Sequence, residues 1–486
     1  MSSLVAQLAP HEIWQHFVAL NAVPRPSKKE ERVIQFIVDF GNQLGLPTIK
    51  DATGNILIKK PATQGMENRQ TVVMQSHLDM VHQKNAETDF NFDTQGIDML
   101  IEGDWVKAKG TTLGADNGIG VASIMGLLAS SNIPHPALEA LFTIDEETGM
   151  TGALGLAPGF LNGRILLNLD TEDDREMTIG CAGGVDVTAI AKYEEQATTA
   201  GLSFFRIQLK GLTGGHSGMD IHKGRGNANK LMNRLLYVVS ETLPIRINSI
   251  DGGSLRNAIP RESMAIVAVP SSSVNDLEQK LQHEFAGIKA EHSTTDGAIQ
   301  LVVSPCDAEK SLLEEGFQKA LLNGIYACPN GIYRMCPDIA GLVQTSNNVA
   351  RVLVKDGSMS IQCLTRSSVD SEKMDLAKAI KSSLAALGGS VNFAGSYPGW
   401  APRPGAGIVA LMNKIYQDRF HEEPMINACH AGLECGIIGK HYPEMEMISF
   451  GPNIHGAHSP DETVQISSVQ KYWGFLLETL QHIPSN

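Results

Sequence analysis

Residues 71–79 read TVVMQSHLD, an apolar run followed at once by a histidine and an aspartate. The run Thr71–Met74 is short and apolar, which is typical of a buried strand. Similar runs lie at Ala140–Ile144 and Ile165–Leu169, and the pattern between the first two predicts a helix from Asp116 to Ser130. Strands that alternate with helices predict an α/β fold, in which helices cover both faces of the sheet.

The middle of the chain has a different pattern. From about residue 190, short strand patterns alternate with helical ones, which resembles two successive split β-α-β units. The elements predicted there are strands at 203–210, 264–269, 299–303 and 390–396, helices near 227–240, 274–288 and 370–386, and a hairpin formed by 349–355 and 359–365. After a turn-rich segment at Ser396–Gly407, a strand at Met445–Phe450 and a helix at Ile466–Leu480 restore the α/β pattern.

We therefore predict one α/β domain, residues 1–189 and 400–486, interrupted by an inserted α+β domain, residues 190–399. The chain has 486 residues, with 39 Lys and Arg against 53 Asp and Glu, and its formal net charge is −14. This acidity argues against a nucleic-acid partner or an anionic membrane surface, because both require a basic field on the protein.

The composition also favours a cytoplasmic protein. The N-terminal sequence shows no basic segment followed by an apolar run, so no signal peptide is expected. No run of about 18 apolar residues occurs, so no membrane span is expected. The seven cysteines include no CxxC pair, which argues against a disulfide framework or a cysteine zinc site and fits a reducing compartment.

Five short segments are rich in side chains that bind metals. They are Ser76-His77-Leu78-Asp79, Gly114-Ala115-Asp116-Asn117-Gly118, Asp145-Glu146-Glu147-Thr148-Gly149, Asn168-Leu169-Asp170-Thr171-Glu172 and His455-Gly456-Ala457-His458-Ser459. Four of them follow a predicted strand, and the other precedes a helix. Functional sites in open α/β sheets gather at the carboxyl ends of the strands, so these segments are expected to converge on one crevice.

The residue types in these segments indicate a metal. Imidazoles and carboxylates without thiolates suit Zn²⁺, Co²⁺ or Mn²⁺. A shared carboxylate can bridge two ions about 3.5–4 Å apart, as in two-metal hydrolases. Of the adjacent pair Glu146 and Glu147, one can bind metal while the other acts as a general base. The residues alone leave that choice open, and they leave His455 and His458 equally eligible as ligands.

Each segment by itself has an ordinary structural interpretation. Asp116 alone would be read as the N-cap of the following helix, and Glu146-Glu147 as a solvated surface pair. Asp170 could end a strand in a turn. The metal interpretation is favoured only because all five segments coincide with one edge of the predicted sheet.

These segments, in this order, resemble the zinc-dependent family that contains carnosinases, aminoacylases, peptidase T, carboxypeptidase G and succinyl-diaminopimelate desuccinylase. The resemblance covers essentially the whole chain. The segments at 114–118, 181–184 (Cys-Ala-Gly-Gly) and 430–436 (His-Ala-Gly-Leu-Glu-Cys-Gly) are similar to the bacterial aminoacyl-histidine dipeptidase branch.

The resemblance implies a role for each residue of the metal site. Asp116 would bridge two zinc ions, and a hydroxide held between them would attack the peptide bond. The other assignments are His77 and Asp170 to one zinc, Glu147 and His458 to the second, Glu146 as the general base, and Asp79 as the partner that fixes the His77 ring. The implied cofactor is two Zn²⁺ per chain, with Co²⁺ or Mn²⁺ as substitutes.

The inserted domain resembles the lid of that family. The resemblance implies that His216 stabilises the oxyanion, that Asn257 and Arg366 bind the substrate, and that Gly432 permits close approach of the backbone. Without the resemblance, His216 would be read as a turn residue and Arg366 as a surface ion-pair residue. The insertion is about twice the length of a single lid, so we expect His216 to serve the site of its own chain.

The resulting expectation is a di-zinc exopeptidase-like catalytic domain with a lid made of two ferredoxin-like halves. Its activity would be hydrolysis of dipeptides, with a preference for Xaa-His substrates that resemble carnosine. An aminoacylase or carboxypeptidase on the same core, or a non-catalytic binding protein, is the alternative. The sequence allows either a homodimer or a monomer.

Overall fold

The computed structural model describes residues 2–486, which form two compact units. Unit 1 contains the chain up to Gly180 together with Pro402–Ala428 and Leu433–Asn486, and unit 2 contains Cys181–Ala401 together with Cys429–Gly432. Unit 2 begins before the predicted boundary at residue 190. The reason is that strand β9 (Gly183–Lys192) pairs with β20 (Ser358–Ser367) and β21 (Ser390–Tyr397), which both belong to unit 2. Residue Gly432 also lies in unit 2.

Unit 1 is built on a mixed eight-stranded sheet with the order β1-β2-β6-β3-β7-β23-β8-β22. These strands are β1 (Thr48–Lys50), β2 (Ile56–Lys60), β3 (Val72–His77), β6 (Leu138–Thr143), β7 (Ile165–Asn168), β8 (Glu176–Cys181), β22 (Met425–Cys429) and β23 (Glu446–Ser449). Strand β3 runs parallel to both β6 and β7, and β7 runs parallel to β23. Every residue of β3 and β6 is buried, as predicted for strands covered on both faces.

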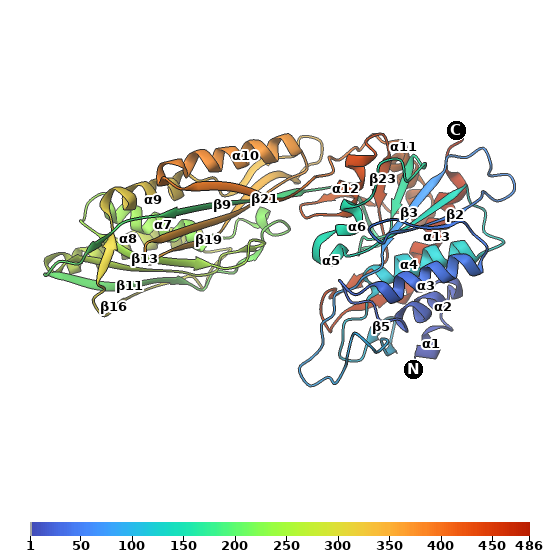
Figure 1. The fold of residues 1–486 in the computed structure, drawn as a ribbon, viewed down its shortest axis with the longest axis horizontal. Coiled ribbons are helices and arrows are strands. Elements are labelled where there is room, and N and C mark those ends of the chain that lie inside the picture. The colour runs from blue at the N-terminus through green and yellow to red at the C-terminus, as the bar shows by residue number, and fades with distance from the viewer. Residues whose placement is uncertain (1) are drawn as a thin grey trace. The chain divides into compact units, whose positions relative to one another are not determined.

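The helices of unit 1 are α1 (Ser2–Val5), α2 (His11–Asn21), α3 (Glu31–Gln43), α4 (Ala115–Ala129), α5 (Glu146–Gly149), α6 (Thr151–Leu154), α11 (Gly407–Phe420), α12 (Glu434–His441) and α13 (Ile466–His482). A small second sheet has the order β24-β25-β5-β4. Its strands are β4 (Met99–Glu102), β5 (Trp105–Ala108), β24 (Ile454–His455) and β25 (Thr463–Gln465). The α/β class predicted from the sequence is confirmed (Figure 1).

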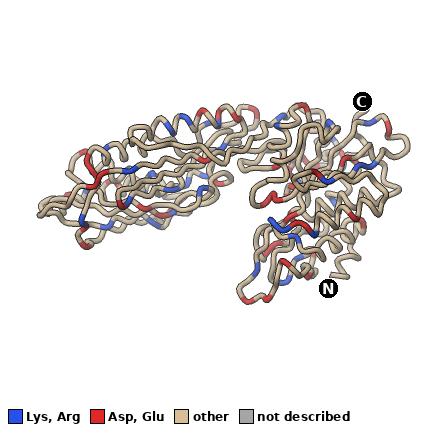
Figure 2. The backbone as a smooth tube through the Cα atoms, viewed as in Figure 1, with Lys and Arg blue, Asp and Glu red and all other residues tan. Residues whose placement is uncertain are grey.

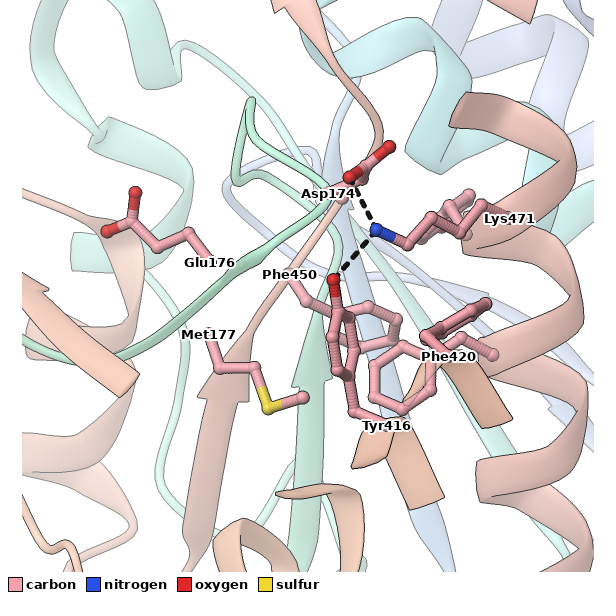
Figure 3. Close-up of a pocket in the computed structure, with 10 residues that line it drawn as sticks. Asp174, Glu176, Met177, Tyr416, Phe420, Phe450 and Lys471 are labelled. Carbon is pink, nitrogen blue, oxygen red and sulfur yellow. Dashed lines mark hydrogen bonds and ion pairs between the residues drawn. The ribbon is translucent and has the colours of Figure 1, made fainter. Parts of the chain in front are cut away.

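Helices α11 and α13 meet at an aromatic cluster that encloses a cavity of about 10 Å³. Figure 3 shows Lys471 directed at Asp174 and at the hydroxyl of Tyr416, to which it donates hydrogen bonds of 2.8 and 2.7 Å. The same ammonium group lies 5.0 Å from the ring centres of Tyr416 and Phe420. The cavity holds at most about one water molecule, and it includes none of the predicted metal ligands. We interpret it as core packing.

Unit 2 contains a nine-stranded sheet composed of two halves with the same topology. The first half has the order β16-β11-β15-β13 and the second β19-β20-β9-β21, and the halves join where β13 pairs with β19. The first consists of β11 (Leu202–Lys210), α7 (Ala228–Ser240), β13 (Arg246–Gly253), β15 (Ser263–Pro270), α8 (Val274–Glu291) and β16 (Gln300–Pro305). The second consists of β9, α9 (Glu315–Ala327), β19 (Val343–Lys355), β20 (Ser358–Ser367), α10 (Asp370–Ser383) and β21 (Ser390–Tyr397).

Each half thus follows the β-α-β-β-α-β order of a ferredoxin-like fold, and the two predicted units are present, but they are nested and not successive. The first half is inserted between β9 and α9 of the second. Helices α7 to α10 pack against the sheet around one core, which includes Val187 of β9, while Ile190 of the same strand is 48% exposed. The sheet is therefore covered by helices on one face.

The remaining elements of unit 2 are short: β10 (Glu195–Ala197), β12 (Gly215–His216), β14 (Ala258–Ile259), β17 (Ser311–Leu313), β18 (Gly331–Met335) and the 3-10 turns Ile221–Lys223, Ser271–Ser273 and Ala385–Leu387. Figure 2 shows Lys and Arg interspersed with Asp and Glu in both units. Among residues 2–486, no helix combines the length and the apolarity that crossing a membrane requires.

Candidate active site

The predicted metal ligands of unit 1 lie at the carboxyl ends of neighbouring strands. His77 is the last residue of β3, Asp170 follows β7, and Glu147 lies in the short helix α5 that follows β6. Because these three strands are parallel, their carboxyl ends share one edge of the sheet. Asp116 lies in the first turn of α4, where its own backbone is not helical, and His458 lies in the loop between β24 and β25.

Asp116 lies between the two histidines. Its Oδ1 atom is 3.2 Å from Nε2 of His77, and its Oδ2 atom is 3.2 Å from Nε2 of His458. The Nε2 atom of His77 is also 3.4 Å from Oδ1 of Asp170, and that of His458 is 3.1 Å from Oε2 of Glu147. The structure thus brings together two groups of possible ligands, with one carboxylate common to both.

The donor atoms in this cluster fit divalent cations. Oε1 of Glu147 is buried and has no hydrogen-bond partner within residues 2–486, and Oδ1 of Asp170, also buried, has only the 3.4 Å approach of His77 Nε2. Buried oxygen atoms without partners are rare in folded proteins, and a bound cation is one way to satisfy them. Imidazole nitrogens and carboxylate oxygens form a donor set that suits zinc, cobalt or manganese.

The electrostatics of the cluster also favour positive charge. Burial raises the pKa of Asp170 to about 6, and the neighbouring Asp116 and Glu147 carboxylates add to this shift. Hydrogen bonds to Asp116 and Glu147 raise the pKa of His458 to about 11. Burial raises the pKa of Glu172 to about 8, helped by Asp116 and Asp170. Neighbouring carboxylates contribute to all three shifts, and a cation would stabilise this concentration of negative charge.

Glu146 and Glu147 have different surroundings. Glu147 belongs to the group with Asp116 and His458, whereas Glu146 is grouped with His77 and Glu147. Burial raises the pKa of Glu146 well above its usual value; His77 opposes this shift, while Asp170 and other nearby carboxylates reinforce it. A carboxyl group whose pKa is raised above its usual value is suited to general acid and base chemistry.

Asp79 connects His77 with the segment that carries the two glutamates. Its Oδ1 atom is 3.3 Å from Nδ1 of His77 and accepts a hydrogen bond of 3.0 Å from the backbone N–H of Glu146. Its Oδ2 atom accepts from the N–H of Glu147 at 3.3 Å and from the hydroxyl of Ser27 at 2.8 Å. A carboxylate behind a ligand histidine fixes the orientation of the ring.

The structure separates the two histidines of the 455–459 segment. His455 lies in β24, with its ring centre 4.7 Å from that of Trp105, and it belongs to none of the possible ligand groups. His458 contacts Asp116 and Glu147.

Sequence reasoning missed several residues that support this cluster, including Arg25, Glu434 and Glu462. The carboxylate of Glu434 is fully buried and accepts hydrogen bonds of 2.6 Å from Gln75 and Thr143. Burial raises the pKa of Glu434 to about 7. The sequence did offer one sign of the importance of Glu434, namely its position in the segment 430–436 that carries the family resemblance. Nothing in the sequence around Arg25 distinguishes it from a surface arginine.

Unit 2 contains a second polar cluster, centred on Arg366. This side chain is only 4% exposed, so the ordinary expectation of a surface ion-pair residue is wrong. Its Nη1 atom donates to the hydroxyl of Tyr397 at 3.0 Å, and Nε lies 3.5 Å from Oγ of Ser217. Gly184 leaves room for the Tyr397 ring, since a Cβ atom there would lie 2.7 Å from it. Within residues 2–486, Arg366 has no ion-pair partner, so its charge is available to an anion.

The lid residues predicted from the resemblance lie in the same unit. Nδ1 of His216 accepts from the backbone N–H groups of Gly218 and Met219 at 3.2 and 3.0 Å, so the ring proton is left on Nε2. Burial lowers the pKa of His216, and Arg366 lowers it further, which keeps the ring neutral. The backbone N–H of Ser217 donates to the carbonyl of Asn257 at 2.7 Å. His216, Asn257 and Arg366 of one chain are therefore linked through Ser217.

The segment that contains Gly432 also reaches this cluster. Nε2 of His430 lies 2.7 Å from Oγ of Ser346. Burial lowers the pKa of His430 to about 3, and the positive charge of Arg366 contributes to the shift. A Cβ atom at position 218 would collide with the carbonyl of His430, so a glycine is required there.

Comparisons with known proteins find relatives that are similar to this chain in both sequence and fold. A family model described as a peptidase dimerisation domain, M20_dimer, matches residues 207–293. The chain is 44% identical over 484 residues to the cytosol non-specific dipeptidase of Escherichia coli (strain K12), covering 99% of this chain and 100% of that protein. The crystal structure of aminoacylhistidine dipeptidase from Vibrio alginolyticus matches with a TM-score of 0.95 and 42% identity, covering 100% of both chains. The aminopeptidase PepT from Bacillus cereus shares the fold at 16% identity, with a TM-score of 0.57 and coverage of 98% of this chain and 99% of that one.

Proposed function

Since the chain belongs to the M20 family of metallopeptidases, we propose that it cleaves the peptide bond of dipeptides and prefers Xaa-His substrates such as carnosine-like peptides. Full-length similarity to two proteins named as dipeptidases supports the dipeptide substrate, and the name of the Vibrio relative supports the histidine preference. The observation that carries the proposal is the position of Asp116 between two groups of metal-binding side chains.

The proposed cofactor is a pair of zinc ions, for which Co²⁺ or Mn²⁺ could substitute. Asp116 would be shared by both ions. His77 and Asp170 would hold one of them, and Glu147 and His458 would hold the other. When bound, such ions polarise a carbonyl group and lower the pKa of water. Asp79 would keep the His77 ring in the orientation that ligation requires.

Glu146 is proposed as the general base. Its carboxylate would take a proton from the attacking water and deliver it to the nitrogen of the leaving amine. The raised pKa of Glu146 supports both steps, because a carboxyl group that is less acidic than usual accepts a proton more readily and can then donate it.

The residues of unit 2 are proposed to bind the substrate. Arg366 would bind the carboxylate of the dipeptide, because a buried guanidinium forms strong charge-assisted hydrogen bonds with that group. Asn257 and the backbone at Gly432 would make further contacts. His216, neutral and with its proton on Nε2, would donate to the oxyanion that forms as the peptide carbonyl is attacked.

We further propose that His216 acts on the substrate bound to its own chain. The doubled lid supports this, because two ferredoxin-like halves within one chain leave no need for the lid of a partner. A homodimer remains compatible, and the match of residues 207–293 to a dimerisation domain supports one. The word cytosol in the name of the Escherichia coli relative supports a cytoplasmic location.

A substrate panel tests this function. Zinc-reconstituted protein is expected to hydrolyse Xaa-His dipeptides faster than other dipeptides, and to cleave N-acyl amino acids and tripeptides poorly. A chelator should abolish the activity, and added zinc should restore it. Preferential hydrolysis of N-acyl amino acids would instead support an aminoacylase on the same core, and no hydrolysis of any member would support a binding protein.

A further inference from the structure

Glu462 binds the backbone of the segment that carries Asp116. It lies in unit 1 just before β25, and only 2% of it is exposed. Its Oε2 atom accepts hydrogen bonds from the N–H groups of Leu113 and Gly114 at 2.7 and 2.9 Å. Its Oε1 atom accepts from those of Ala115 and Asp116 at 2.7 and 3.2 Å. One carboxylate therefore satisfies four successive backbone donors.

These four donors have no local acceptor. They precede or begin helix α4, and the N–H groups of a first helical turn lack partners within the helix. The residue at the N-cap position, Gly114, has a φ of 71° and no side chain that could cap the helix. The acceptor is instead supplied by a glutamate 346 residues further along the chain than Asp116.

Glu462 also belongs to the loop that carries His458. The N–H of Glu462 donates to the carbonyl of Ser459 at 3.1 Å, and that of Ser459 to the carbonyl of Gly456 at 3.2 Å, so the loop is folded on itself between these residues. The carboxylate of Glu462 thus holds the backbone of Asp116 at a fixed place relative to His458. The 3.2 Å approach of His458 Nε2 to Asp116 Oδ2 joins the same two segments.

Arg25 holds the same segment from another direction. Its Nη2 atom donates to the carbonyl of Gly114 at 2.6 Å, and Nη1 donates to the carbonyls of Leu78 and Asp79 at 3.1 and 3.2 Å. Arg25 therefore connects the Asp116 segment to the segment after His77. Glu462 connects the Asp116 segment to the loop that carries His458. Of these two residues, Glu462 therefore provides the contact on the His458 side.

We propose that Glu462 is a positioning residue of the metal site, which sets the place of the shared carboxylate Asp116 relative to His458. The inference rests on the proposed metal site. It assigns Glu462 no contact with substrate or metal, and its effect passes through the backbone of Asp116. Glu462→Gln keeps the size of the side chain but replaces an acceptor oxygen with an NH₂ group that faces N–H donors. This change should displace Asp116 without removing any ligand.

Glu139 provides a matched control. It is a buried glutamate of unit 1 whose carboxylate accepts from the backbone N–H groups of Asn162 and Gly163 at 2.7 and 3.0 Å. It lies near the start of β6, at the opposite end of that strand from Glu146. The carboxylate also forms an ion pair of 2.9 Å with Lys59. Glu139→Gln therefore disturbs a buried carboxylate at least as strongly, and it should leave the metal site intact.

The experiment is a zinc competition titration of the full chain against a chelating dye, combined with dipeptide kinetics and thermal unfolding of the metal-free protein. For Glu462→Gln we expect at least one zinc to bind roughly 10–100-fold more weakly, as for other groups that orient metal ligands. We also expect kcat to fall while KM is unchanged, since substrate binding is assigned to other residues. Glu139→Gln should retain the parent affinity and kcat.

A purely structural role predicts a different result. If Glu462→Gln lowers thermal stability but binds both ions as tightly as the parent and retains kcat, the inference is wrong. Should that variant fail to fold, Glu462→Asp, which keeps the charge and shortens the side chain, carries the same test with the same two outcomes. A parent protein that binds fewer than two ions would contradict the proposed metal site itself.

Discussion

The two units of the chain carry polar clusters of opposite character. In unit 1, carboxylates crowd around His77 and His458, and burial among them raises the pKa of Asp170 to about 6. In the cluster of unit 2, the central charge is the buried guanidinium of Arg366, and burial together with this charge lowers the pKa of His430 to about 3. The first environment favours a proton or a cation, and the second favours an anion.

This difference indicates what each unit contributes to the proposed reaction. A dipeptide has a scissile carbonyl that a cation can polarise and a terminal carboxylate that an arginine can bind. If unit 1 performs the chemistry and unit 2 recognises the substrate, substitutions in the two units should have different kinetic signatures.

Substitution in unit 1 should reduce turnover without reducing substrate binding. For Glu146→Gln we expect kcat to fall by about 10²–10⁴-fold, the usual contribution of a general base. KM and the zinc content should not change, because Glu146 is assigned to proton transfer. Steady-state kinetics and metal analysis of the purified variant check this, and full turnover would remove Glu146 from the mechanism.

Substitution of His216 tests whether unit 2 also takes part in the chemical step. His216→Ala should lower kcat by about 10²–10³-fold, as the loss of one oxyanion donor does elsewhere. Mixing this variant with Glu146→Gln should restore no activity if each His216 serves its own chain. Recovery in the mixture would mean that two chains share their sites, and the assignment to one chain would be abandoned.

Arg366 should affect recognition more than turnover. Arg366→Ala removes a charge-assisted hydrogen bond to the substrate carboxylate, worth about 1.5–3 kcal/mol, so kcat/KM should fall roughly 10–100-fold, mainly through KM. Arg366→Lys should recover only part of the loss, because an ammonium cannot form the two-pronged contact. An unchanged kcat/KM for dipeptides would exclude Arg366 from the site.

Tyr397 should have the smallest effect, since it acts by orienting Arg366. Tyr397→Phe removes one hydrogen bond worth about 1 kcal/mol, and a loss of roughly fivefold in kcat/KM is expected. Tyr193→Phe is the control, because the hydroxyl of Tyr193 has no hydrogen-bond partner among the described residues. Equal losses in both variants would show that Tyr397 has no special relation to Arg366.

The elements that position the metal site were predictable because local patterns determine them. The buried run at Thr71–Met74 became β3, which continues to His77, and the helix predicted at Asp116–Ser130 became α4. When ligand side chains directly follow an apolar run, the sequence indicates both where the strand lies and which residues stand at its end. The predicted ligands could therefore be placed at one sheet edge before any geometry was known.

The residues that orient the site were not predictable in this way. Arg25 and Glu462 are buried charges whose partners are backbone groups far away in the sequence, and no periodicity marks such residues. Tyr397 lies in the segment 396–407, which the sequence marked only as turn-rich, although it is the last residue of β21. These contacts arise from tertiary packing, which only the folded chain reveals.

Anomalous diffraction from zinc-soaked crystals tests the central claim most directly, since it locates metal ions without reference to activity. The account predicts two zinc peaks in unit 1, both in contact with Asp116. One should also contact His77 and Asp170, and the other Glu147 and His458. A single peak, or two peaks that do not share Asp116, would contradict it.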